Sequence, residues 1–134
     1  MKEIRMLNQG LFSAIGGLLG IQFGELDGVL YALLAFMVFD YLTGVFAAVV
    51  EKQVSSHIGF KGLFKKVAIL CLVSVAHLID TAVLKEGGAI RTMVIFFYLS
   101  NEGLSILENV VRLGLPVPAK LEQILKQCHD KEEL

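Results

Sequence analysis

The chain has 134 residues, of which 55% are hydrophobic, and its formal net charge is −1 at pH 7. A soluble domain is usually about 45–50% apolar, and its helices carry charges along their length. Here every Lys and Arg lies outside the long apolar runs. Composition therefore excludes an ordinary soluble globular domain, and the lack of a basic face argues against nucleic-acid binding. We expect one all-α domain that sits in a membrane through three to four helices.

The first apolar segment, residues 11–24, is the shortest. Its apolar core would span only about 20 Å as a helix, whereas a bilayer needs about 30 Å. Gly16, Gly20 and Gly24 recur every fourth residue and would form a smooth strip for close helix packing, although they also suit a flexible segment. Three interpretations stay open: a spanning helix, a segment on the outer membrane surface, and a cleaved signal peptide.

The second apolar segment, residues 29–50, is long enough to cross a bilayer and has one charged residue, Asp40, at its midpoint. Inserting a carboxylate at the centre of a membrane helix costs roughly 2.5–3.5 kcal/mol. Asp40 therefore needs a partner. Gly44 lies one turn away on the same face, and we expect this face to associate with other helices.

Residues 51–66 form a polar connector that mixes aromatic and aliphatic residues with Lys61, Lys65 and Lys66. This mixture is typical of a segment that lies in the membrane interface with its lysines toward water. An ordinary cytoplasmic loop is the alternative. Both interpretations place the lysines on the same side of the membrane.

The third apolar segment, residues 67–84, contains His77 and Asp80, which are three positions apart and so share one helix face. A His–Asp pair suggests catalysis, but no nucleophile motif and no set of metal ligands accompanies it. Two polar groups that satisfy each other in lipid are the simpler interpretation. We therefore expect no enzymatic activity, no catalytic or metal site and no cofactor. Cys71 and Cys128 lie in an apolar run and a charged tail, so we expect no disulfide between them.

The fourth segment, residues 92–111, begins strongly apolar and becomes polar toward its end. Its polar residues fall at heptad-like spacings and therefore form one stripe along a helix. They are Tyr98, Asn101, Glu102, Ser105, Glu108, Asn109 and Arg112. Lipid does not tolerate such a face. The stripe must either pack against other helices or line water, and both alternatives stay open.

Residues 114–134 form a charged tail after the membrane domain of residues 1–113. Gly114 suits the end of the fourth helix, and Pro118 suits the first turn of another. Apolar residues at positions 121, 124, 125 and 128 predict a short amphipathic helix. With four spans, ten Lys and Arg residues share the side of both termini and two lie opposite. We therefore expect a cytoplasmic tail.

A series of short motifs runs through residues 30–125. They are Asp40-Tyr41-Leu42-Thr43-Gly44, Lys61-Gly62, Lys65-Lys66, Asp80, Asn101-Glu102-Gly103-Leu104-Ser105, Glu108-Asn109 and Gly114-Leu115-Pro116-Val117-Pro118. In this order and spacing they resemble the phage-type holin family that includes the toxin-secretion holins.

The resemblance implies a small protein of the bacterial inner membrane that associates with copies of itself and opens large lesions. Endolysins or large toxins then cross without a signal peptide. Its implied partners are the lipid bilayer, further copies of the chain and a regulatory antiholin. Two alternatives stay open: the chain is itself an antiholin, or it is a small proton- or cation-coupled transporter or channel. Transporters often contain internal repeats, and none is evident in this sequence.

Overall fold

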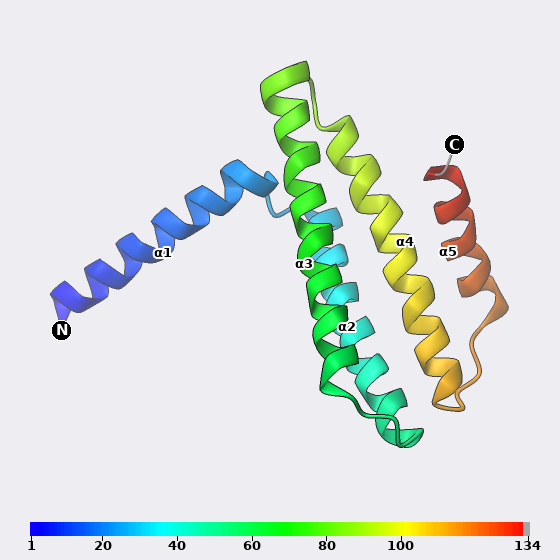
Figure 1. The fold of residues 1–134 in the computed structure, drawn as a ribbon. Coiled ribbons are helices and arrows are strands. Elements are labelled where there is room, and N and C mark those ends of the chain that lie inside the picture. The colour runs from blue at the N-terminus through cyan, green and yellow to red at the C-terminus, as the bar shows by residue number, and fades with distance from the viewer. Residues whose placement is uncertain (133–134) are drawn as a thin grey trace.

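The protein is entirely helical over residues 1–132, the part that the computed structural model describes. Figure 1 shows α2, α3 and α4 side by side in an up-and-down bundle, with α5 beside α4 and α1 projecting away. The elements are α1 (Lys2–Phe23), α2 (Gly28–Val50), α3 (Ser56–Leu78), its π-helical continuation η1 (Ile79–Leu84), α4 (Ala89–Arg112) and α5 (Ala119–Glu132). The all-α expectation is confirmed.

Within residues 1–132, two helices are long and apolar enough to cross a bilayer: α2, with 23 residues, and the continuous α3–η1 helix, with 29. At 1.5 Å per residue they measure about 34 and 44 Å. Only 17% of the apolar window of each helix is buried, whereas the core helix of a soluble protein is mostly buried. These two helices support a membrane location, and the expected three to four spans stay a prediction.

The expected connector of residues 51–66 is mostly helical. Only residues 51–55 link α2 to α3, because α3 begins at Ser56 and contains Lys61, Lys65 and Lys66. Lys61 and Lys65 are exposed, whereas Lys66 is largely covered. A helix boundary at the lysines was expected because charges usually stay outside membrane helices. The helix continues because Lys66 finds partners inside the bundle.

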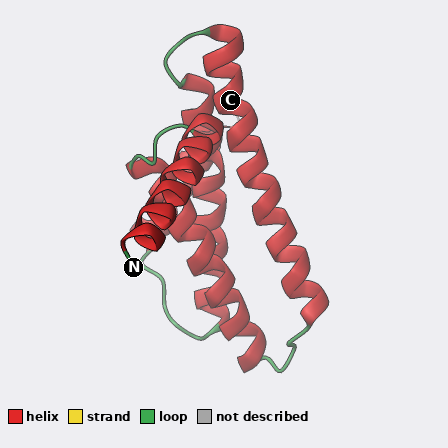
Figure 2. Cartoon of the chain, turned by 90° about the vertical axis from the view of Figure 1, so that its left-hand side faces the viewer, coloured by secondary structure: helices red, strands yellow, loops and turns green. Residues whose placement is uncertain are grey.

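Helix α1 begins at Lys2, nine residues before the expected segment, and none of its residues is buried. Figures 1 and 2 show it leaving the bundle obliquely, with the N-terminus level with the middle of the bundle. Gly24 lies beyond the end of the helix, so the glycine strip is limited to Gly16 and Gly20. Among residues 1–132, and apart from the adjacent backbone of α1 itself, no atom lies within 4 Å of a Cβ placed at either residue. Packing of this strip against another chain stays a prediction.

The tail does not extend away from the bundle. Gly114, with a φ of +86°, ends α4, and α5 folds back along it. A Cβ placed at Gly103 of α4 would lie 2.9 Å from a Leu125 methyl group and 3.2 Å from the Phe36 ring of α2. The missing side chain at Gly103 therefore provides the space into which α5 packs.

The apolar core occupies one end of the bundle, near the α1–α2 and η1–α4 turns. It joins Leu30, Leu33 and Met37 of α2 to Val73 of α3 and Ile95 of α4. The other end, toward the 51–55 link, contains the polar residues that three helices bring together. Apolar packing is therefore concentrated in the half of the bundle near these two turns, and polar contacts between α2, α3 and α4 follow toward the 51–55 link.

We predict that Gly24→Ala destabilises the fold, whereas Gly17→Ala does not. Gly24 has φ 79° and ψ −171°, a conformation that costs a non-glycine residue of order 1–3 kcal/mol. Its Cβ would also lie 2.9 Å from Arg91 Nε and 3.0 Å from the His77 ring. Gly17 has open space around it, and Ala favours helix by about 1 kcal/mol. Thermal unfolding in detergent micelles tests this, and equal melting temperatures for both variants would contradict it.

Candidate functional site

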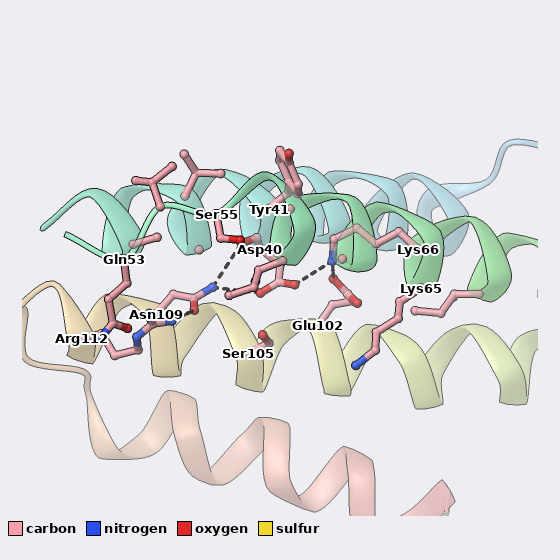
Figure 3. Close-up of a pocket in the computed structure, with 18 residues that line it drawn as sticks. Asp40, Tyr41, Gln53, Ser55, Lys65, Lys66, Glu102, Ser105, Asn109 and Arg112 are labelled. Atoms are coloured by element: carbon pink, nitrogen blue, oxygen red, sulfur yellow. Dashed lines mark hydrogen bonds and ion pairs between the residues drawn. The ribbon is translucent and has the colours of Figure 1, made fainter. Parts of the chain in front are cut away.

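One lysine joins three helices at the polar end of the bundle. Lys66 Nζ of α3 lies 2.7 Å from Asp40 Oδ2 of α2 and 2.5 Å from Glu102 Oε2 of α4. The three side chains are 14%, 15% and 9% exposed, respectively. Figure 3 shows them pointing toward one another. We call Asp40, Lys66 and Glu102 the Lys66 cluster.

Asn109 extends the Lys66 cluster along α4. Its side-chain nitrogen lies 3.0 Å from Asp40 Oδ1, 3.1 Å from the Asp40 carbonyl oxygen and 3.1 Å from Thr43 Oγ1. Asp40 thus uses both carboxylate oxygens, one toward α3 and one toward α4. A Cβ at Gly44 would lie 3.5 Å from the Asn109 amide, which is an ordinary contact. A residue with a Cβ at position 44 would therefore still leave room for the hydrogen bonds of Asn109.

Two carboxyl groups share one ammonium group in the Lys66 cluster, so the cluster would carry a formal net charge of −1 with both acids ionised. In a low-dielectric site the two acids repel each other unless the cation stays between them. Replacing a whole buried ion pair with apolar residues is often neutral, but removing one partner leaves an uncompensated charge and costs about 3–5 kcal/mol. Lys66 is therefore the residue on which the cluster depends.

A cavity of about 440 Å³ leads from the 51–55 link to the Lys66 cluster. Its wall includes Gln53 and Ser55 of the link, Lys65 of α3, and Ser105 and Arg112 of α4. Figure 3 shows polar atoms along its length. The rest of the wall is largely apolar and includes Val45, Val54 and Ile58. The volume has room for several water molecules beside the polar groups.

An exposed ion pair stands at the mouth of the cavity. Arg112 donates to both carboxylate oxygens of Glu51, at 3.0 and 2.6 Å, and also to Asn109 Oδ1 at 3.3 Å. These hydrogen bonds hold the pKa of the Glu51 carboxyl below its ordinary value and raise the pKa of the Arg112 guanidinium. A continuous polar chain therefore runs from Glu51 at the surface to Glu102 inside.

Arg91 ties the opposite end of the bundle together. Its guanidinium donates to the Phe23 carbonyl at 2.7 Å, the Glu25 carbonyl at 2.9 Å and Asp27 Oδ2 at 2.8 Å. Phe23 is the last residue of α1 and Asp27 caps α2, accepting from the Leu30 amide at 2.9 Å. We call this set of contacts the Arg91 clamp. It joins the α1–α2 turn to the start of α4.

The expected pairing of His77 with Asp80 is wrong. The Asp80 carboxylate is 1% exposed and accepts instead from the backbone amides of Ile90 and Arg91, at 3.1 and 2.8 Å. The first amides of a helix have no partner within it, so α4 supplies ready donors. The helix also changes to π geometry at Ile79, so Asp80 lies in the first turn of η1. The His77 ring lies against Gly24.

The polar stripe of α4 divides between two environments. Glu102, Ser105 and Asn109 line the cavity, whereas Glu108 is exposed on the side of α5. Tyr98 packs against the apolar core, and Asn101 is half-buried. Of the two open alternatives for the stripe, the isolated chain adopts inward packing for its central residues.

Sequence reasoning missed two of the residues that hold the site. Lys66 was expected in the membrane interface with Lys61 and Lys65, and no role was expected for Arg91. Two signals were available in the sequence. Lys66 directly precedes the apolar stretch of its helix, and Asp40 needed a cation as a partner. Within residues 1–132, no group of three or more His, Cys, Asp or Glu side chains is placed to hold a metal ion.

We predict that Lys66→Met costs about 3–5 kcal/mol of unfolding free energy because it leaves two carboxylates without their cation. Lys65→Met is the matched control, since Lys65 is exposed and has no ion pair among the described residues. The measurement is denaturant unfolding in mixed micelles. A triple variant, Lys66→Met with Asp40→Asn and Glu102→Gln, should recover most of the loss. Equal stability of the two Lys→Met variants would contradict the role of Lys66.

We also predict an acid-sensitive contribution from the Arg91 clamp. The hydrogen bond from Arg91, followed by that from Leu30, holds the pKa of Asp27 below its ordinary value of 3.8. Ionised Asp27 therefore stabilises the fold above that value, and the contribution is lost as pH falls through the lowered folded pKa. Asp27→Asn keeps the helix cap but not the charge. Between roughly pH 5 and 3 the wild type should lose more thermal stability than Asp27→Asn, and parallel losses would contradict the prediction.

Comparison with known proteins finds a matching family and several similar proteins. The model of the bacteriophage holin family matches residues 17–130. A Listeria monocytogenes protein, Lmo0128, is 46% identical, covering 87% of this chain and 90% of its own. A 14.9 kDa Clostridium perfringens protein is 41% identical, covering 96% and 97%.

A third relative carries a functional name. It is a probable holin of Bacillus phage phi105, which is 35% identical over 72% of this chain and 70% of its own. No solved structure matches the fold. The family match covers most of the chain and includes the Lys66 cluster, the Arg91 clamp and all of α2, α3 and α4. The chain belongs to the bacteriophage holin family.

Proposed function

We propose that the protein is a pore-forming holin of the bacterial cytoplasmic membrane. Copies of the chain assemble in the bilayer and open a lesion through which an endolysin or a toxin leaves the cell. Membership of the holin family supports this proposal, as do the two apolar helices of spanning length. The proposal needs no enzymatic chemistry.

The observation that carries the proposal is the Lys66 cluster. In the isolated chain it turns polar groups of α2, α3 and α4 inward. The cluster lies at about the middle of α2, since Asp40 is 12 positions, or about 18 Å, from Gly28. Lipid cannot replace these contacts. If the helices separate, only water or another copy can satisfy the same groups. A bundle of this kind is stable when closed. When it opens, its polar groups favour contact with water or with other copies of the chain.

The distribution of positive residues supports an orientation. The 51–55 link and the α4–α5 turn lie at one end of the bundle, together with Lys52, Lys61, Lys65 and Arg112, whereas Lys85 and Arg91 lie at the other. Positive residues near membrane helices favour the cytoplasmic side. We therefore place the open end of the cavity and the end of α4 toward the cytoplasm.

Inducible expression in bacteria tests the function when a membrane-potential dye and a folded cytoplasmic reporter enzyme are followed together. We expect abrupt depolarisation with release of the enzyme. Asp40→Leu should abolish timed release because Lys66 and Asn109 lose their shared acceptor. Asp40→Asn should retain part of it because an amide still bonds across helices. Normal timing with Asp40→Leu would contradict the role of Asp40.

The cavity also favours a second candidate, a small cation- or proton-coupled transporter or channel. It leads from the bundle end to the two acids Asp40 and Glu102, and acids inside membrane proteins often carry ions. The same assay separates the candidates. A transporter changes the membrane potential without releasing a folded enzyme. An antiholin releases nothing when expressed alone and delays release by an active holin.

A further inference from the structure

The cavity beside the Lys66 cluster joins two kinds of surface. The residues that α4 contributes to its wall are all polar: Glu102, Ser105, Asn109 and Arg112. Val45 of α2, Val54 of the link and Ile58 of α3 form apolar flanks and are exposed. A volume of about 440 Å³ falls in the size range of small-molecule sites. The polar side and the exposed apolar flanks suit a ligand that is polar at one end and apolar at the other.

Most of the charged groups in the wall already have partners. The two acids of the cluster share Lys66, and Arg112 pairs with Glu51. Lys65 also lines the cavity, but it is exposed and forms no ion pair with another described residue. In Figure 3 its ammonium group points toward α4. The wall therefore leaves one positive charge for an incoming anion.

Four neutral side chains in the wall have hydrogen-bonding groups to offer. Tyr41, Gln53, Ser55 and Ser105 line the cavity, and none of these side chains bonds to another described residue. A ligand that displaces water from these groups must replace the hydrogen bonds that the water made. The ligand that matches this wall therefore has one negative charge, for Lys65, and several neutral oxygen atoms or hydroxyl groups.

The depth of Lys65 gives it a need for an anion. Helix α2 has 23 residues and measures about 34 Å, close to the hydrocarbon thickness of about 30 Å, so the 51–55 link that follows it lies at headgroup level. Lys65 is nine positions, or about 14 Å, beyond the start of α3 at Ser56. It therefore lies below the headgroups, where an unpaired charge is costly. The cavity connects the link with Lys65.

We propose that the cavity binds the headgroup of an anionic phospholipid. The phosphate lies at Lys65, the neutral groups of the headgroup bond to Gln53, Ser55 and Ser105, and the acyl chains leave past Val45 and Ile58 into the bilayer. Phosphatidylglycerol has this chemistry, with one phosphate charge and two free hydroxyl groups. Pockets between membrane helices that contain basic side chains bind anionic headgroups in this way. The proposal rests on the membrane location of the bundle and does not require that a lesion opens.

Lipid titration of the purified full-length protein in uncharged detergent micelles tests the site, with bound lipid counted by native mass spectrometry. The probes are phosphatidylglycerol, phosphatidylcholine with the same acyl chains, and free glycerol phosphate. We expect one tightly bound phosphatidylglycerol per chain and a raised melting temperature when it binds. Lys65→Gln should weaken this binding about tenfold, the usual effect of losing one charge-assisted hydrogen bond. Lys61→Gln is the matched control, because Lys61 is exposed on the same helix but does not line the cavity.

A second variant fills the cavity without changing its charge. Ser105 is half-buried in the wall, so Ser105→Leu should abolish lipid binding while circular dichroism shows the helices intact. If this variant does not fold, the Lys65 and Lys61 variants still decide the question.

Three outcomes would overturn the proposal. They are equal phosphatidylglycerol affinity of the Lys65→Gln and Lys61→Gln variants, equal binding of phosphatidylcholine, and equally tight binding of free glycerol phosphate, which would show a site for a soluble anion. Failure of the expressed protein to release a folded reporter enzyme would instead contradict the proposed function, because lipid binding is measured without a lesion.

Discussion

The bundle depends on one ammonium group held between two carboxylates. Lys66 contacts Asp40 on α2 and Glu102 on α4, so a single atom fixes the relative positions of three helices. The apolar core, which reaches Met37 on α2, cannot replace it because apolar groups do not neutralise a carboxylate. Without the cation the two acids would repel each other across the interface that they hold together.

The two ends of the bundle differ in how readily they can change. The Arg91 clamp satisfies backbone carbonyls, a helix cap and the first amides of α4 in one compact set of hydrogen bonds. The Lys66 end instead adjoins a cavity that contains several polar groups, where water can compete for the contacts that line it. We therefore expect helix separation to begin at the cavity end and the clamp end to act as the pivot.

The peripheral helices carry the surfaces that the isolated chain leaves unsatisfied. Helix α1 is held only near its end, by the Arg91 clamp and by a hydrogen bond between Gln22 and Ser74, and its remaining length is exposed. Helix α5 packs on α4 and leaves Gln123, Lys126 and Gln127 exposed. Both features suit a chain that completes its environment with lipid, water and further copies, which is the behaviour that a holin requires.

The sequence by itself determined the helical class, the apolar helix centred on Asp40 and the amphipathic character of α5, because hydrophobicity and spacing act within one helix. It also showed that Asp40 needs a partner. Only the tertiary structure decided which partner, since Lys66 is 26 residues from Asp40, and Asn109 is 69 residues away. The same holds for Arg91, which is 64 residues from Asp27, and for the true partners of Asp80. Such contacts depend on how whole helices pack, and no local pattern encodes that packing.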